Sequence, residues 1–120
     1  MPLRPLRLAA VILALAAWPN VPRASAQDIT AEGVARSYSL FAVLGEVCAR
    51  FYPVDPKRVE AYKATFKAIG ADAFGAEAYS RALASELPRR HEEVTATGEE
   101  RWCMHQKRDL AARGAKDLFL

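Results

Sequence analysis

The sequence predicts an all-α domain of about four helices, crosslinked by one disulfide and preceded by a cleaved signal peptide. Apolar residues recur at steps of three and four along several segments, which is typical of amphipathic helices. The sequence contains no alternating, β-branched run of strand length. Its two cysteines, Cys48 and Cys103, fall on the apolar faces of two different predicted helices. These three observations together favour a small, crosslinked helical bundle.

The first 26 residues have the features of a secretory signal peptide. Two arginines precede an apolar run over residues 8–18, prolines follow it, and small residues occupy positions 24–26. The run has 11 residues, whereas a membrane-spanning helix needs roughly 20. We therefore expect cleavage after Ala26, no stable membrane insertion of the mature chain, and a periplasmic or secreted protein. The alternative is an uncleaved N-terminal helix that packs on the domain.

The predicted mature chain, residues 27–120, is electrically neutral. Three of the 17 Lys and Arg residues lie within residues 1–26, and none of the 14 Asp and Glu residues does, which leaves 14 of each sign. The basic character of the whole sequence thus belongs to its N-terminal segment. It indicates neither a nucleic-acid partner nor a polybasic membrane surface. The mature length suits a single domain with one core.

The first helix is predicted from Thr30 to Tyr52. Thr30 or Asp28 can cap its start, and Pro53 prevents it from continuing. We expect Gly45 within this helix to permit the close approach of a neighbouring helix. The predicted apolar stripe consists of Val34, Tyr38, Phe41, Leu44, Cys48 and Phe51.

The second helix is predicted to begin at the Asp55-Pro56 pair, where aspartate suits the cap and proline the first turn. We expect Gly70 to end it and residues 71–74 to form a short connection. The other faces of this helix are charged, so one side should be buried. That side carries Val59, Tyr62, Phe66 and Ile69.

The third and fourth helices are predicted over residues 76–87 and from about Gly98 to Arg113. We expect Pro88 to kink or restart the third helix, with residues 89–96 as a polar extension. Gly114 is the expected stop of the fourth helix. Its apolar stripe is thin, which suits a helix held covalently through a cysteine. The stripe residues are Tyr79, Leu83 and Leu87 in the third helix, and Trp102, Cys103, Gln106 and Leu110 in the fourth.

Cys48 and Cys103 are predicted to form a structural disulfide. An even cysteine count in a small exported chain normally indicates a disulfide, and two cysteines allow one intramolecular pairing. Loop-closure entropy gives such a crosslink, over about 55 residues, a contribution on the order of 4 kcal/mol. The alternatives are a free or intermolecular thiol and a redox or metal role. Neither a CxxC motif nor a compact Cys/His cluster favours the latter.

The sequence offers no recognisable catalytic or metal-binding constellation. His91 and His105 lie among charged residues, and the acidic pairs Glu92-Glu93 and Glu99-Glu100 have the pattern of a solvated helix surface. A nucleophile elbow, a phosphate-binding glycine loop and a haem-attachment motif are all missing from the sequence. We therefore expect no enzymatic activity, no cofactor and no bound metal.

Aromatic residues are the remaining indication of a binding site. Tyr38, Tyr62 and Tyr79 each lie on a different predicted helix and either fill the core, which we prefer, or line a groove for a peptide or small apolar ligand. Trp102 and Phe119 are further candidate contacts. The C-terminal residues 117–120 are either a docking tail or a segment that returns to cover the core.

By elimination, the sequence favours an exported protein that acts by binding another exported or envelope protein, as a chaperone, inhibitor or assembly accessory. The alternative is a carrier that holds a small apolar ligand between its helices. A third hypothesis is an enzyme whose site uses residues interpreted above as surface. A carrier needs an internal cavity, whereas a protein-binding module needs an exposed apolar patch.

Overall fold

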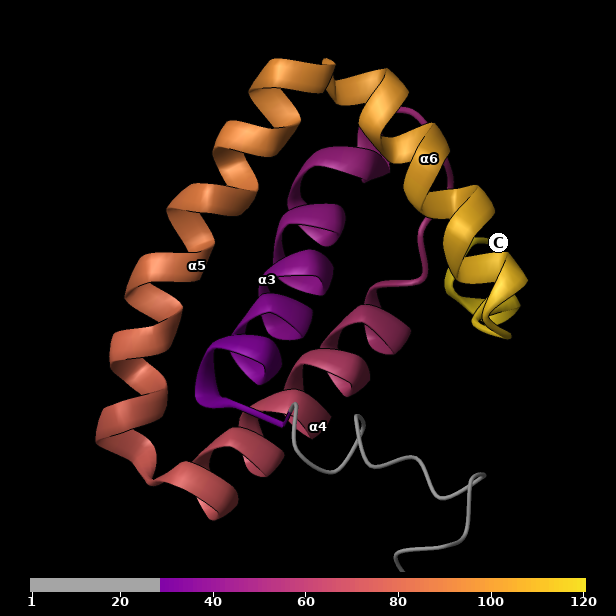
Figure 1. The fold of residues 1–120 in the computed structure, drawn as a ribbon. Helices are drawn as coiled ribbons and strands as arrows, with labels where there is room; N and C mark the ends of the chain where they lie inside the picture. Colours follow the sequence, from indigo (N-terminus) through magenta and orange to yellow (C-terminus); the bar gives the residue numbers. More distant parts are fainter. Residues whose placement is uncertain (1–28) are drawn as a thin grey trace, which may run out of the picture.

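A computed structural model describes residues 29–120, and over this range the protein is all-helical (Figure 1). The predicted fold of about four helices with one disulfide is confirmed for these residues. The predicted signal peptide and its cleavage site at Ala26 lie outside the described range. The helices are α3 (Ala31–Val47), α4 (Pro56–Phe74), α5 (Ala76–Thr97) and α6 (Glu99–Ala112), with 3₁₀ turns η1 (Cys48–Arg50) and η2 (Lys116–Leu118).

Helix α3 begins at the predicted cap but ends earlier than the predicted Tyr52. The Thr30 hydroxyl accepts a hydrogen bond from the Gly33 amide at 2.9 Å. After Val47 the chain tightens into η1, where the amides of Phe51 and Tyr52 both donate to the Cys48 carbonyl at 3.0 Å. Pro53 restricts the preceding Tyr52, and so prevents a helix from continuing beyond this turn.

Helix α4 starts at the predicted Asp55-Pro56 signal, and the Asp55 carboxylate accepts from the Lys57 amide at 3.0 Å. The predicted stop at Gly70 is wrong, because the helix continues to Phe74 and ends at Gly75, whose φ is 88°. Gly70 is instead a packing position. A Cβ atom built there would lie 2.3 Å from the ring of Tyr79, so only glycine lets that ring approach.

Helix α5 runs through Pro88 without restarting and includes the predicted polar extension. Proline removes the hydrogen bond that Ala84 would otherwise accept. Both residues are exposed, so water can reach the freed carbonyl group. At Gly98, with φ 95°, the chain turns directly into α6.

Helix α3 is the central element, packed against α4 on one side and α5 on another (Figure 1). Helices α5 and α6 diverge from their junction at Gly98 and form an arch with α3 between them. The larger apolar core lies where α3, α4 and α6 meet, and a smaller one lies between α3 and the first half of α5. Fully or almost fully buried members of the larger core are Val43, Leu44, Cys48, Trp102, Cys103 and Leu118.

The C-terminal segment returns across the α3–α4 connection. The Asp55 amide donates to the Leu118 carbonyl at 2.9 Å, and the Leu120 amide donates to the Pro53 carbonyl at 2.8 Å. Leu118 is completely buried, whereas the side chain of Leu120 is 77% exposed. Of the two alternatives for residues 117–120, the structure thus shows a segment that covers the core.

Candidate functional site

The three candidate tyrosines lie in the seams between helices. Tyr38 and Tyr79 meet edge to face, with ring centroids 6.5 Å apart, and Tyr62 stacks on Phe41 at 4.6 Å. The Tyr79 ring is almost fully buried, and its hydroxyl finds no hydrogen-bond partner among residues 29–120. Burial, with a smaller effect of Tyr38, raises the pKa of Tyr79. The grooves described below are lined by other residues.

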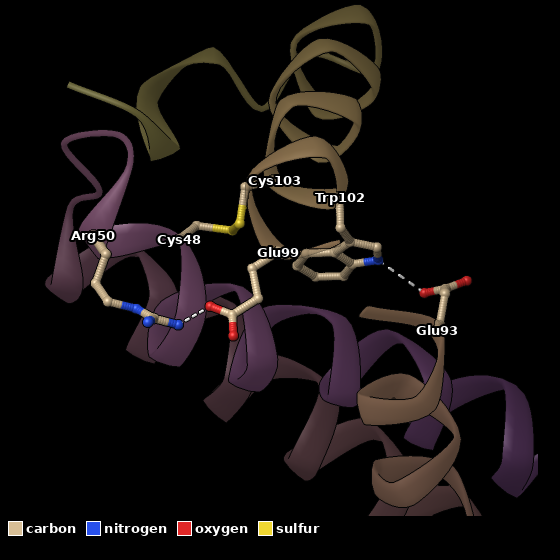
Figure 2. Close-up of a disulfide and its surroundings, with 6 residues drawn as sticks. All are labelled: Cys48, Arg50, Glu93, Glu99, Trp102 and Cys103. Carbon is tan, nitrogen blue, oxygen red and sulfur yellow. Dashed lines mark hydrogen bonds and ion pairs between the residues drawn. A yellow bond between two sulfur atoms is a disulfide. The ribbon is translucent and has the colours of Figure 1, made fainter. Parts of the chain in front are cut away.

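Trp102 is buried beside the Cys48–Cys103 disulfide and connects α6 to α5 (Figure 2). Its indole N–H donates to the Glu93 carboxylate at 3.0 Å. On the other side of the disulfide, Arg50 forms an ion pair with Glu99. The beginning of α6 is therefore fixed by a covalent, a hydrogen-bonded and an ionic contact.

Phe119, the last candidate contact, packs on the α3–α4 connection. Its ring meets that of Tyr52 edge to face at 6.3 Å, and the Lys107 ammonium lies 4.8 Å from the centroid of the Tyr52 ring. Phe119 is only partly buried. The five candidate contacts are thus distributed over several seams.

Arg90 is the centre of a polar network between α3 and α5. Its side chain is 14% exposed and makes three hydrogen bonds: to the Ser39 hydroxyl at 3.2 Å, the Arg36 carbonyl at 2.9 Å and the Glu93 carboxylate at 2.8 Å. Burial alone would raise the pKa of Glu93, but the hydrogen bonds from Trp102 and Arg90, with the charge of Arg90, lower it below its usual value. This network holds the Arg90 guanidinium in one orientation.

Glu86 extends the network along α5. Its side chain is 4% exposed and faces Arg36 at 3.5 Å and Arg89 at 3.8 Å. Both arginines are themselves more than half exposed, so the buried carboxylate holds two cationic groups at the surface. Together with Arg90, these residues give the arch a cationic inner edge.

A groove of about 330 Å³ opens between α3, α5 and α6, and we call it the arginine groove. Among residues 29–120, no carboxylate lines it. The Arg113 side chain makes no hydrogen bond or ion pair to any residue between 29 and 120. The residues that line the arginine groove are Gly33, Arg36, Ser37, Leu40, Arg90, Gln106 and Arg113.

A second groove, of about 340 Å³, lies at the start of α3 beside the end of α4, and we call it the apolar groove. Ile29 and Ile69 are 59% and 43% exposed there. The predicted burial of Ile69 is therefore wrong, since α4 extends beyond the part of it that α3 covers. The lining residues are Ile29, Thr30, Gly33, Val34, Ser37, Phe66 and Ile69. Gly33 and Ser37 line both grooves, which makes them one continuous surface.

A third groove, of about 520 Å³, is larger than the two described above; it follows the seam between α3 and α4, and we call it the seam groove. The close approach predicted at Gly45 is confirmed there, because an added Cβ atom would lie 2.8 Å from Val59. Lys63, on its rim, is paired with Glu60 at 3.1 Å. The lining residues are Ala42, Gly45, Glu46, Ala49, Val54, Pro56, Val59, Glu60 and Lys63.

Over residues 29–120, the structure brings together no group of three or more His, Cys, Asp or Glu side chains that could hold a metal ion. None of the helices in this range is long and apolar enough to cross a membrane. Comparison with known protein families, with curated proteins and with solved structures finds no match.

The arginine groove escaped prediction from sequence, because its members come from three separate helices. One signal was present: Gly33, Arg36, Ser37 and Leu40 recur at helical spacing on a second stripe of the first helix. We call these four residues the α3 face. Their mixed composition resembles an ordinary wet surface, and only the arch of α5 and α6 makes it concave.

Proposed function

We propose that this protein is an exported, non-catalytic binding protein whose target is another exported or envelope protein. The observation that carries this proposal is the α3 face, which no helix of residues 29–120 covers between α5 and α6. This face continues without interruption into the apolar groove, where two isoleucine side chains are exposed. An exposed apolar patch beside polar groups is typical of protein-interaction surfaces.

The chemistry of this surface supports binding rather than catalysis. A guanidinium group stays protonated at all physiological pH values, so the arginines can orient an anion but cannot act as general bases. Glu93, whose carboxylate accepts a hydrogen bond from Arg90, has a lowered pKa and carries no proton to donate at neutral pH. Export is supported by the signal-like features of residues 1–26 and by the disulfide, which is typical of oxidising compartments.

Site-specific photocrosslinking in the cells that make the protein tests this proposal. A photoreactive phenylalanine derivative replaces Ser37, at the centre of the surface, or Thr65, an exposed position on α4 outside the three grooves. We expect a discrete protein adduct from position 37 and none from position 65. The same adducts from both positions, or no protein adduct from position 37, would contradict the proposal.

The seam groove supports a second candidate function, a carrier of a small apolar ligand. Its volume of about 520 Å³ falls within the usual range of small-molecule sites. Native mass spectrometry of the protein from its own cells tests this alternative. A retained mass of a few hundred daltons that is lost on Ala42→Trp, but kept on the surface substitution Ala84→Trp, would favour the carrier.

A further inference from the structure

We infer that the partner binds through an acidic peptide segment flanked by apolar side chains, with carboxylates in the arginine groove and apolar groups in the apolar groove. The inference rests on the proposed function and names the chemistry of its partner. It starts from the junction of the two grooves, where Gly33 and Ser37 line both.

The surface along the arch has a positive local charge. Four arginines at the inner edge of the arch face two carboxylates, so this surface carries a positive excess. The seam groove, by contrast, is lined by two glutamates and one lysine. Arg113 in particular lacks an anionic partner among the described residues. The four arginines are Arg36, Arg89, Arg90 and Arg113, and the two carboxylates are Glu86 and Glu93.

The guanidinium groups of Arg90 and Arg36 are held in place before any ligand binds. Ser39, Glu93 and the Arg36 carbonyl hold the Arg90 guanidinium in place, and the buried Glu86 carboxylate faces Arg36. Fixed guanidinium groups lose little side-chain freedom on binding and match the planar geometry of a carboxylate. A carboxylate entering the arginine groove therefore meets donors that are already positioned.

The surface formed by the two grooves is long enough for a short peptide. Thr30 and Leu40, near its two ends, are ten residues apart on α3, which corresponds to about 15 Å along a helix axis. An extended segment of about five residues covers this distance. A fatty-acid anion would bring a single carboxylate to three guanidinium groups, whereas a peptide can bring several. The geometry therefore favours a peptide over a small amphipathic anion.

Selection from a phage-displayed library of random dodecapeptides tests the inference. The bait is the protein recovered from cells that express it, with the Cys48–Cys103 disulfide formed. We expect enriched peptides with Asp or Glu next to Leu, Ile or Phe, and weaker binding as the salt concentration rises. Synthetic versions should lose at least tenfold in affinity, by fluorescence anisotropy, on Arg113→Glu and several-fold on Ile69→Ser.

Matched variants control for charge and hydrophobicity. Arg101→Glu makes the same charge change within α6, the helix that ends just before Arg113, and Met104→Ser removes a similarly exposed apolar side chain. Both residues line a different groove, beside Tyr52. These variants should bind the peptides as the unsubstituted protein does. All four positions are exposed, and melting curves verify that each variant is folded.

Three outcomes overturn the inference. Enriched peptides without acidic residues, or equal losses on Arg101→Glu and Arg113→Glu, would place peptide binding elsewhere and leave the proposed function standing. No enrichment, with binding of dodecanoate that Arg113→Glu abolishes, would identify the surface as a site for a small anion. The photocrosslinking experiment tests the proposed function separately, because the absence of a protein adduct at position 37 would contradict it.

Discussion

At the scale of single residues, the Glu93 carboxylate accepts hydrogen bonds from both Arg90 and Trp102. One carboxylate thereby fixes a guanidinium of the arginine groove and the indole that anchors α6. Both contacts are stronger with the charged form of Glu93, and together they lower its pKa, although partial burial alone would raise it. The orientation of the groove and the position of α6 therefore depend on the same ionisation.

We expect the stabilising effect of Glu93 to depend on pH. Because its folded-state pKa is lowered, the contribution is complete above the unfolded-state value of about 4.5 and is lost as the pH falls through the folded-state value. Glu93→Gln should therefore lower the melting temperature near pH 6, and the difference from the unsubstituted protein should shrink toward pH 3. Circular dichroism melts across this range measure it. Glu92→Gln, at an exposed neighbouring position, should leave the melting temperature nearly unchanged, and a Glu93→Gln difference that stays constant with pH would contradict the assignment.

A second prediction concerns the contact between Gly70 and Tyr79. Gly70→Ala should destabilise the fold by about 1–3 kcal/mol despite the better helix propensity of alanine, because its methyl group would overlap the Tyr79 ring. Urea denaturation measures the loss. In a Tyr79→Ala background the same substitution should cost nothing or stabilise the helix. Equal effects in both backgrounds would show that the ring is not the cause.

At the scale of elements, α6 depends on its attachments more than on its own apolar face. Trp102, Cys103 and Leu110 are its only buried residues, as the thin stripe in the sequence predicted. The disulfide, the Trp102–Glu93 hydrogen bond and the Arg50–Glu99 ion pair all act on its first half (Figure 2). Losing the covalent link should therefore free this helix first.

We expect the double substitution Cys48→Ser and Cys103→Ser to lower the free energy of unfolding by about 2–4 kcal/mol. Hydrogen exchange should accelerate in α6 and η2 before it does so in α3 and α4, which contact each other extensively. Mass spectrometry of exchanging peptides resolves these segments. If hydrogen exchange accelerated equally in all helices, or if the free energy of unfolding were unchanged, the disulfide would not have a structural role confined to this end of the molecule.

The elements also show which features the sequence could predict. The start of α4 and the end of α6 were predictable, because an Asp-Pro pair and a glycine act through local backbone chemistry. The predicted stop at Gly70 was wrong, because Gly70 is a packing position against Tyr79 within a helix that continues to Phe74. Pro88 did not interrupt α5, because it lies on an exposed side where water can reach the freed carbonyl group. Local rules could not predict the arginine groove either, because Arg36, Arg90 and Arg113 meet only after three helices have packed.

At the scale of the whole molecule, the remaining prediction is the covalent form of the chain that the proposed export would produce. Signal-peptide features in residues 1–26 predict a product that begins at Gln27 and has 94 residues. Intact-mass measurement and N-terminal sequencing of the protein from its own cells read this directly. A product that retains Met1, or one in which both cysteines react with an alkylating agent under native conditions, would contradict the proposed export.

Single glycines, Gly75 and Gly98, connect the three helices between Pro56 and Ala112, so these connections cannot accommodate an inserted residue without moving a helix. The orientation of each helix about its axis therefore depends on the helix before it, and one inserted residue rotates the following helix by about 100°. An insertion after Gly98 should therefore rotate Cys103 away from Cys48, which non-reducing peptide mapping would detect as free thiols. An insertion between η1 and α4 has a connection of several residues to absorb it, and should leave the disulfide intact. Length variation in this fold is thus tolerated at one junction and forbidden at two.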